Sequence, residues 1–253
     1  MRLQNKVAII TGGGTGIGRA CALAFAREGA KVALVGRRSK LLDDVAREIG
    51  ADHALAIPGD INRRGTIDDV LERTHKRFGA IHVLVNNAGV LIPGTADSLT
   101  EEQWQETFNT NVHALWRFSR AVLPYMRKSG AGSIINMSSV VGLIGAHNRV
   151  AYAASKGAVT LMTKAMALDQ AGENIRVNCI CPGIIETELV ADVVRKAPDP
   201  KAARRQREAL HAMNRFGQPP EVAAMAVFLA SDEASFITGA AFTVDGGYTA
   251  GKA

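Results

Sequence analysis

The sequence is poor in cysteine, and it has no apolar run long enough to cross a membrane. Its three cysteines, Cys21, Cys179 and Cys181, are too few and odd in number for a disulfide framework, which indicates the reducing cytoplasm. Cys179 and Cys181 have no second Cys or His pair at zinc-ligand spacing, so we expect buried apolar side chains and no metal site. Neither the first apolar run, Val7–Ile10, nor any later one suits a signal peptide or a membrane span.

A large excess of either charge and a large share of aromatic residues are also missing. Thirty basic against twenty-four acidic residues leave a net charge of +6, and the basic residues lack interleaved aromatics, so nucleic-acid binding is not expected. Aromatics make up 5% of the chain while glycines number 25, which favours small aliphatic packing of helices on a parallel sheet. No Pro/Gly/Ser-rich linker divides the chain, which predicts one domain over residues 1–253.

Short apolar runs alternate with amphipathic stretches along the whole chain. The predicted strands are Val7–Ile10, Lys31–Val35, Ala54–Ile57, Ile81–Val85, Ser133–Met137, Arg176–Ile180 and Ala241–Val244. The predicted helices are 17–29, 39–49, 64–78, 100–128, 152–171 and 220–230. This alternation predicts an α/β fold, a Rossmann-like doubly wound parallel sheet of about seven strands with helices on both faces. The rhythm is lost over 184–216, which predicts a lid over substrate at about 187–216.

A glycine-rich turn follows the first predicted strand directly. It reads Thr11-Gly12-Gly13-Gly14-Thr15-Gly16-Ile17-Gly18 and leads into a helical pattern. Glycines at such a place let the backbone turn sharply and approach a pyrophosphate, which the amino terminus of the helix then stabilises. The spacing departs from the usual G-x-G-x-x-G, and a purely structural turn is the alternative. Its position between strand and helix favours dinucleotide binding.

The end of the second predicted strand bears on which dinucleotide binds. An NAD site commonly has a carboxylate there to bond the ribose 2′-hydroxyl. This chain has Gly36 instead, followed by Arg37 and Arg38, whose guanidinium groups suit a 2′-phosphate. We therefore expect NADP(H), with NAD(H) as the alternative if the arginines are merely solvated.

Tyr152 and Lys156 stand four residues apart at the start of an apolar helical pattern, and therefore on one helical face. A tyrosine pKa of about 10 is too high for efficient proton transfer near neutrality, and a nearby lysine cation lowers it. By itself the pair also suits an exposed helix surface.

Polar residues after two other predicted strands strengthen this interpretation. Ser138 and Ser139 follow one strand, and Asn86-Asn87-Ala88-Gly89 follows another. The carboxyl ends of parallel strands form the usual ligand-binding edge of such sheets. The combination indicates an acid/base site beside a bound cofactor.

Taken together, these residues resemble the short-chain dehydrogenase/reductase family in its single-domain form. The resemblance covers nearly the whole chain. It is carried by Thr11–Gly18, Asp60, Asn86–Gly89, Asn111, Ser139, Tyr152, Lys156, Pro182-Gly183, Thr187, Gly239 and Asp245-Gly246-Gly247. It implies an NAD(P)-dependent enzyme that moves a hydride between nicotinamide and a carbonyl or alcohol.

The resemblance also implies roles for individual residues. Tyr152 is the catalytic acid/base, Ser139 orients and polarises the substrate oxygen, Lys156 lowers the tyrosine pKa and holds the ribose, and Asn111 supports a water relay. Ser139 rather than Ser138 is chosen because it stands thirteen residues before Tyr152. The implied cofactor contacts are Gly12, Gly14, Thr15, Gly16, Ile17 and Gly18 at the phosphates, Arg37 and Arg38 at the ribose, Asp60, Ile61, Asn87, Ala88 and Gly89 on the adenosine side, and Tyr152, Lys156, Pro182, Gly183, Ile185 and Thr187 at the nicotinamide.

Substrate identity is less defined by the sequence. Ser139, Val141, His147 and Arg149 are candidates for the pocket, although His147 and Arg149 equally suit an exposed loop. The segment 195–215 carries seven basic and two acidic residues, so it either attracts an anionic carrier or coenzyme A, or is a solvated helix face.

The resemblance favours a reductase similar to 3-oxoacyl-thioester reductases, and a homotetramer. The alternatives are an NAD-dependent dehydrogenase of a sugar, polyol, steroid or dihydrodiol, and a non-catalytic cofactor-binding regulator. The intact set Asn111, Ser139, Tyr152 and Lys156 argues against the regulator.

Overall fold

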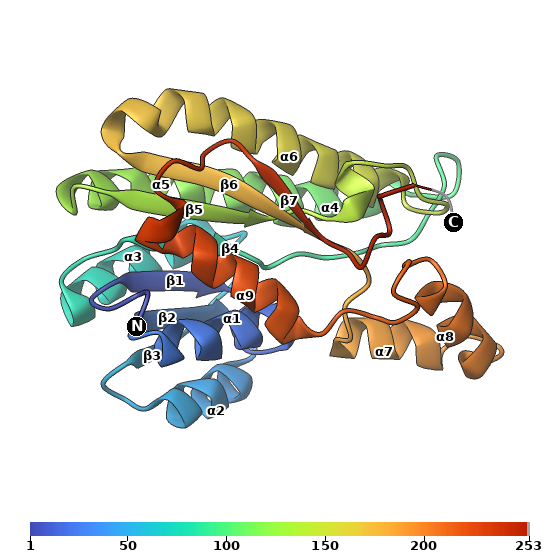
Figure 1. Ribbon diagram of the computed structural model, residues 1–253, viewed down its shortest axis with the longest axis horizontal. Helices are drawn as coiled ribbons and strands as arrows, with labels where there is room; N and C mark the ends of the chain where they lie inside the picture. Colours follow the sequence, from blue (N-terminus) through green and yellow to red (C-terminus); the bar gives the residue numbers. More distant parts are fainter. Residues whose placement is uncertain (252–253) are drawn as a thin grey trace.

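The chain folds around one parallel sheet whose strands are short and mostly apolar. The computed structural model describes residues 1–251, apart from the side chain of Leu189. The strands are β1 (Val7–Thr11), β2 (Lys31–Gly36), β3 (Ala54–Pro58), β4 (Val83–Asn86), β5 (Gly132–Met137), β6 (Ile175–Pro182) and β7 (Ala241–Val244). They form a seven-stranded sheet in the order β3-β2-β1-β4-β5-β6-β7, with every neighbouring pair parallel (Figure 1). The predicted doubly wound fold is confirmed.

Helices cover both faces of this sheet and enclose two apolar cores. The helices are α1 (Gly16–Arg27), α2 (Ser39–Ile49), α3 (Arg64–Phe78), α4 (Glu101–Phe108), α5 (Ala114–Lys128), α6 (Val150–Gln170), α7 (Glu188–Arg195), α8 (Pro200–Glu208) and α9 (Pro219–Ala230). Residues of α1, α2 and α9 share one core, and residues of α3, α5 and α6 share the other. Every residue of β1 is buried, because helices cover this strand on both sides.

The small side chains of the core allow the helices to lie close to the strands. All three cysteines are buried as free thiols, as the sequence predicts. A Cβ on Gly132 would lie 2.6 Å from the sulfur of Met126, so only glycine fits where β5 passes under α5. The low aromatic content of the sequence is therefore matched by close helix-on-sheet packing.

Many predicted ends differ from the observed ones by one or two residues; the fourth strand, for example, begins at Val83 rather than Ile81. His82, just before this strand, already pairs with β1, because its N–H donates to the Val7 carbonyl and its imidazole accepts from the Val7 N–H at 3.0 Å. The predicted helix 100–128 is interrupted by a π-helical turn over Asn109–His113 between α4 and α5. Such turns carry one extra residue and turn a side chain out of the helical register.

The segment in which the strand rhythm stops contains two short helices. Figure 1 shows α7 and α8 beyond the end of the sheet at which β6 ends, separated from the layers of the sheet and its covering helices. None of the helices in residues 1–251 combines the length and the hydrophobicity needed to cross a membrane.

Candidate active site

The glycine turn between β1 and α1 adopts a backbone that only glycine tolerates. Gly12 and Gly16 have φ angles of +68° and +51°, in the left-handed region. A Cβ on Gly18 would lie 2.1 Å from the carbonyl oxygen of Gly12, so the first turn of α1 passes directly against the loop. The loop therefore presents backbone N–H groups at a helix amino terminus, which fits a pyrophosphate.

A threonine and an asparagine join this turn to the neighbouring strand. The Thr11 hydroxyl accepts hydrogen bonds from the N–H groups of Asn87 (2.9 Å) and Ala88 (3.0 Å) and donates to the Val85 carbonyl. The Asn87 amide donates in turn to the Thr11 carbonyl at 2.9 Å. These bonds hold the glycine turn and the segment from Asn87 to Gly89 together as one surface. A site that binds both halves of a dinucleotide requires such a surface.

The residues expected at the ribose lie at the end of β2. Arg37 and Arg38 are both exposed, and Arg38 donates to the Thr15 hydroxyl at 3.2 Å, beside the glycine turn. A Cβ on Gly36 would meet only the Leu42 methyl groups, the nearest at 3.5 Å. The place where NAD-specific sites have a carboxylate is therefore open, with two guanidinium groups next to it.

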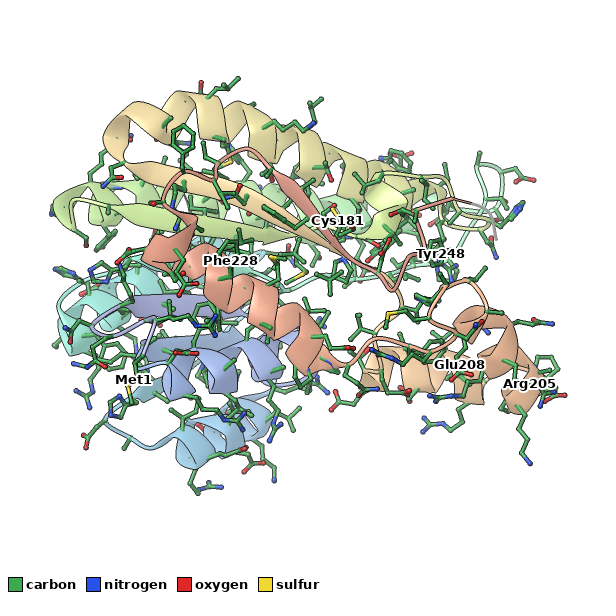
Figure 2. The ribbon with its side chains drawn as sticks, viewed as in Figure 1. Met1, Cys181, Arg205, Glu208, Phe228 and Tyr248 are labelled. Atoms are coloured by element: carbon green, nitrogen blue, oxygen red, sulfur yellow. The ribbon has the colours of Figure 1, made fainter. Side chains whose placement is uncertain are left out.

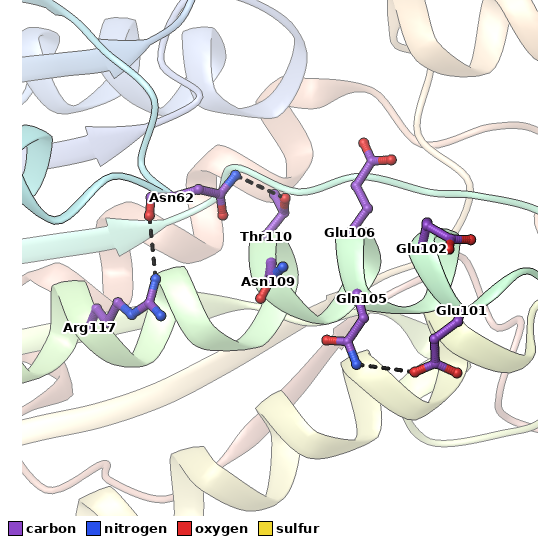
Figure 3. Close-up of a pocket in the computed structure, with 8 residues that line it drawn as sticks. All are labelled: Asn62, Glu101, Glu102, Gln105, Glu106, Asn109, Thr110 and Arg117. Atoms are coloured by element: carbon purple, nitrogen blue, oxygen red, sulfur yellow. Dashed lines mark hydrogen bonds between the residues drawn. The ribbon is translucent and has the colours of Figure 1, made fainter.

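On the adenosine side, a short segment after β3 is fixed to the π-helical turn. The Asp60 carboxylate accepts a hydrogen bond from the Asn62 N–H at 3.0 Å, and Ile61 is buried between them. Asn62 donates to the Thr110 hydroxyl at 3.2 Å, and its carbonyl accepts from Arg117 at 3.3 Å (Figure 3). Asp60 is thereby held at the carboxyl edge of the sheet, where its predicted adenine contact would be.

Beside this anchor, the surface has a hollow of about 690 Å³ along α4. Figure 3 shows its lining, which includes Glu101, Glu102 and Glu106. These carboxylates would repel the phosphates of a dinucleotide, and none of the predicted catalytic residues lines the hollow. The hollow is therefore separate from the chemistry of the site.

The structure brings Ser139 and Tyr152 together at the carboxyl edge of β5. Thirteen residues separate Ser139 and Tyr152 in the sequence, yet the Ser139 hydroxyl lies close enough to influence the pKa of Tyr152. Burial raises the pKa of Tyr152, while the Ser139 hydroxyl and the charge of Arg149 oppose the rise. Tyr152 is therefore protonated near neutrality and suited to donate a proton.

The neighbouring serine has a different task. The Ser138 hydroxyl is buried, donates to the Lys156 carbonyl at 3.0 Å and lies 2.8 Å from the Thr160 hydroxyl. A Cβ on Gly142 would lie 2.8 Å from the Ser138 hydroxyl and from the Lys156 backbone, so only glycine fits there. Ser138 fixes α6 against the end of β5, and Ser139 remains the candidate for the reactive hydroxyl.

Lys156 is buried beneath the tyrosine. Its Nζ donates to the Met137 carbonyl at 2.7 Å and lies 5.6 Å from the centre of the Tyr152 ring. Burial lowers the pKa of Lys156 to about 8. The charge of Arg149 also lowers the pKa of Tyr152, which the sequence analysis did not foresee.

Asn111 lies in the π-helical turn and links three segments of the site. Its amide oxygen accepts from the Val90 N–H at 2.8 Å, and its Nδ2 donates to the Val90 carbonyl at 2.9 Å and to Ser155 at 3.1 Å. A Cβ on Gly89 would lie 3.1 Å from the Asn111 oxygen and 3.6 Å from the Lys156 Nζ. The extra residue of the π turn is what directs Asn111 toward the lysine.

A buried polar ladder below these residues was missed by the sequence analysis. Asn86 donates to Ser119 and to Asn136 at 2.9 Å each, and Asn136 donates to Thr163 at 2.9 Å. It links β4, β5, α5 and α6. Its only signal in the sequence is a polar residue inside an apolar strand, which by itself does not identify partners.

The nicotinamide side is formed by the segment after β6. Thr187 caps α7 by accepting a hydrogen bond from the Val190 N–H at 3.4 Å. A Cβ on Gly16 would lie 3.1 Å from the Thr187 methyl group, so this segment lies against the glycine turn. Pro182 ends β6, the Gly183 N–H donates to the Val244 carbonyl at 3.1 Å, and Ile185 is buried. The predicted residues on this side therefore lie close to the phosphate turn.

His211 anchors residues 187–216, the segment that the sequence predicts as a lid, and nothing in the sequence indicates this role. It is buried, and its Nε2 accepts from the Ile184 N–H at 3.1 Å. Its ring packs edge-on against Phe216 and Tyr248. Figure 2 shows Tyr248 beside the lid, after the last strand. The anchor joins segments that are far apart in the chain, which is why sequence spacing does not reveal it.

The candidate substrate residues divide into two groups. Val141 is half-buried next to Ser139, whose hydroxyl accepts its N–H at 3.3 Å, and Arg149 is half-buried near Tyr152. His147 is exposed. Within residues 1–251, no cluster of three or more His, Cys, Asp or Glu side chains is placed to hold a metal ion.

Comparison with known proteins gives consistent results. Residues 12–249 match the family model described as "Enoyl-(Acyl carrier protein) reductase". The chain is 40% identical to the 3-oxoacyl-[acyl-carrier-protein] reductase FabG of Thermotoga maritima, over 98% of this chain and 99% of that protein. It is 39% identical to the NADP-dependent (R)-specific alcohol dehydrogenase of Lentilactobacillus kefiri, over 98% of each chain. It is 37% identical to the meso-2,3-butanediol dehydrogenase of Serratia marcescens, over 99% of this chain and 97% of that protein.

Proposed function

The chain belongs to the short-chain dehydrogenase/reductase family and is an NAD(P)-dependent oxidoreductase of carbonyl and alcohol substrates, and we propose that it works as an NADPH-dependent carbonyl reductase with Tyr152 as proton donor. The observation that carries the catalytic assignment is the placement of Tyr152 beside Ser139 and 5.6 Å from the Nζ of the buried Lys156. Bound nicotinamide supplies the hydride.

The roles of the side chains follow from their placement. As the carbonyl carbon is reduced, negative charge builds on its oxygen, and the Ser139 and Tyr152 hydroxyls stabilise that charge by hydrogen bonding. Tyr152 then gives up its proton, and the charge of Arg149 favours the resulting tyrosinate. Lys156 and Asn111 support the site through their hydrogen bonds with the backbone of Met137 and Val90. Alcohol oxidation reverses these steps.

The preference for NADP(H) is supported by the end of β2. Gly36 leaves room at the ribose, and Arg37 and Arg38 form no ion pair with any carboxylate of residues 1–251. A guanidinium without a carboxylate partner is available for a 2′-phosphate. Thr15, where some NADP-using family members have a basic residue, weighs against the preference.

Exchanging Gly36 for aspartate tests this preference. The new Cβ makes only ordinary contacts, so Gly36→Asp should fold normally. Its carboxylate should repel a 2′-phosphate and bond a 2′-hydroxyl, which shifts the ratio of catalytic efficiencies toward NADH by about tenfold or more. A parent enzyme that already prefers NADH contradicts the proposal.

For the substrate, 3-oxoacyl thioesters are the first class to test. The relative from Thermotoga maritima supports this class, and relatives named for alcohols and butanediol support small ketones and secondary alcohols as the alternative. Rates measured with thioesters and neutral ketones under saturating NADPH separate the two.

We also propose a cytoplasmic homotetramer. The three buried free thiols support a reducing compartment. Trp116 on α5 and Leu161 and Leu168 on α6 are 44%, 69% and 83% exposed, which favours contact with further copies of the chain. Light scattering should give about four times the chain mass of 26.8 kDa. A stable monomer of 26.8 kDa would contradict the tetramer.

A further inference from the structure

Lys156 is held at two points by successive residues at the end of β5. Its Nζ donates to the carbonyl of Met137, the last residue of the strand, at 2.7 Å. Its own backbone carbonyl accepts a hydrogen bond from the hydroxyl of Ser138, the next residue, at 3.0 Å. Lys156 and Ser138 are only 4% and 2% exposed, so little water competes for these bonds. The end of β5 therefore holds both the charged tip and the backbone of the lysine.

The Ser138 hydroxyl is a rigid support for this bond. The N–H of Ser138 donates to the Ile180 carbonyl of β6 at 2.8 Å, so its backbone is fixed to the sheet. A Cβ on Gly142 would lie 2.8 Å from the Ser138 hydroxyl and 2.8 Å from the Lys156 carbonyl oxygen. The bond between Ser138 and Lys156 is thus enclosed by β6, by α6 and by the turn after Ser139.

A second hydroxyl reaches the same carbonyl from within α6. Thr160 stands four residues after Lys156, and its Oγ1 donates to the Lys156 carbonyl at 3.0 Å. The same Oγ1 lies 2.8 Å from the Ser138 hydroxyl. The two hydroxyls and the carbonyl therefore form a closed triangle, in which each oxygen lies within hydrogen-bond distance of the other two. We call this triangle of Ser138, Thr160 and the Lys156 carbonyl the lysine clamp.

A contact of the same chemistry further along α6 does not touch the lysine. Thr163 is buried, donates to the Val159 carbonyl at 2.8 Å and accepts from the Asn136 amide of β5 at 2.9 Å. Thr160 and Thr163 thus each bond the carbonyl four residues earlier and each meet a polar side chain from β5 or its end. Because Thr163 already attaches α6 to the strand, what Thr160 adds is a fixed backbone at Lys156.

We propose that Ser138 and Thr160 are positioning residues whose hydroxyls hold the Lys156 backbone in place for the reaction. The lysine clamp keeps the Lys156 Nζ on the Met137 carbonyl and 5.6 Å from the centre of the Tyr152 ring. The proposal rests on the carbonyl reductase function above and deepens it. Misplacement by about 1 Å can cost about a hundredfold in rate, so the clamp should act on kcat rather than on substrate affinity.

Thr160→Val tests the clamp, because valine has the shape of threonine without its hydroxyl. With ethyl 3-oxobutanoate as a neutral ketone and the preferred cofactor at saturation, kcat should fall about tenfold while KM stays within about twofold. Ser138→Ala should have the same effect, and the double variant should lose little more than either, because both hydroxyls act on one carbonyl. Thr160→Ser keeps the hydroxyl and should restore kcat to within about twofold of the parent.

Thr163→Val is the matched control, because it removes an equal hydroxyl from the same helix away from the lysine. It leaves an N–H of Asn136 unpaired, so its melting temperature should fall at least as far as that of Thr160→Val. Its kcat should nevertheless stay within about twofold of the parent.

A readout without turnover is the affinity for NADPH or NADH, measured by fluorescence titration. Lys156 is expected to hold the nicotinamide ribose, so a displaced lysine should weaken cofactor binding. Thr160→Val and Ser138→Ala should raise the Kd about threefold or more, and Thr163→Val should leave it unchanged.

The outcomes separate this inference from the function on which it rests. Parental kcat in Thr160→Val, or equal kcat losses in Thr160→Val and Thr163→Val, would overturn the clamp and leave the carbonyl reductase intact. A parent protein that reduces no ketone would contradict the carbonyl reductase, and the titration would then decide on the clamp. Weaker cofactor binding in Thr160→Val and Ser138→Ala alone would support it, and equal affinity in all variants would overturn it.

Discussion

The floor of the active site, formed by the buried hydrogen bonds of Thr11, Asn86 and Asn111, and the predicted lid segment 187–216 are held by different kinds of interaction. The lid segment is held by exposed ion pairs, such as Arg204 with Glu186, by a backbone hydrogen bond from Met213 to Gly246, and by the buried His211. The comparison indicates that the floor tolerates less change than the lid segment.

The energies of these interactions explain the division. A buried polar group left without its partner costs about 1–3 kcal/mol, so any change in the floor is strongly penalised. Exposed ion pairs contribute only about 0–1 kcal/mol each, so the lid can change its contacts at small cost. We therefore expect substitutions in the floor to have large effects and those in the lid to have smaller and substrate-dependent ones.

The largest effect should come from removing the tyrosine hydroxyl in the floor. Tyr152→Phe deletes the proton donor and one of the two groups that stabilise the oxyanion, so kcat should fall by about a hundredfold or more. Cofactor affinity, measured by fluorescence titration, should stay within about threefold, because the phenol contributes little to binding. Near-parental turnover in the purified variant would contradict the assignment of Tyr152 as proton donor.

The next largest effect should come from the glycine turn. In Gly18→Ala the new methyl group would lie 2.1 Å from the Gly12 carbonyl oxygen, which neither backbone can avoid without moving. We expect a loss of about 3 kcal/mol in the free energy of unfolding and weaker cofactor binding. Gly65→Ala in α3 is the control, since its Cβ meets no atom within 4 Å and should leave stability unchanged or raised.

The buried lysine predicts a pH dependence of stability. The pKa of Lys156 is about 8 in the folded protein and 10.5 in its ordinary state. Above pH 8 the unfolded chain therefore binds more protons at this position than the folded protein, so this group makes stability rise with pH. The rise should be about 2 kcal/mol by about pH 9.5.

Denaturant unfolding of the cofactor-free protein and of Lys156→Met, each at about pH 8 and about pH 9.5, measures this rise in the free energy of unfolding. The pKa values of Cys21, Cys179 and Tyr152 are raised in the folded protein, so these groups lower stability at alkaline pH in both proteins. The difference between the two proteins therefore isolates the lysine. Parallel pH curves for the two proteins would show that the lysine keeps its ordinary pKa.

The smallest of these effects should come from the lid anchor. His211→Leu leaves the Ile184 N–H without its partner, which should cost about 1 kcal/mol in the free energy of unfolding. It should also speed proteolysis within 187–216 and raise KM more than it lowers kcat. Proteolysis rates and KM equal to the parent values would mean that the other contacts of the segment hold it without His211.

Much of the fold and of the candidate catalytic set could be predicted from the sequence. The apolar runs of the strands, the glycine turn and the four-residue spacing of Tyr152 and Lys156 are local patterns, and the structure contains the corresponding strands, turn and helix. The order of the elements determined the doubly wound topology, because parallel crossovers have one hand. The choice of Ser139 over Ser138 came from the spacing to Tyr152 that the family resemblance implies, and it stays a prediction.

Tertiary structure alone decided which distant groups meet. The anchor at His211 and the contact of Arg204 with Glu186 join residues that are separated in the chain. Asn111, in the π-helical turn, bonds the backbone of Val90, which is a contact between separate elements. A sequence records local preference and periodicity, whereas burial, charge pairing and the resulting pKa shifts depend on neighbours that only folding brings together.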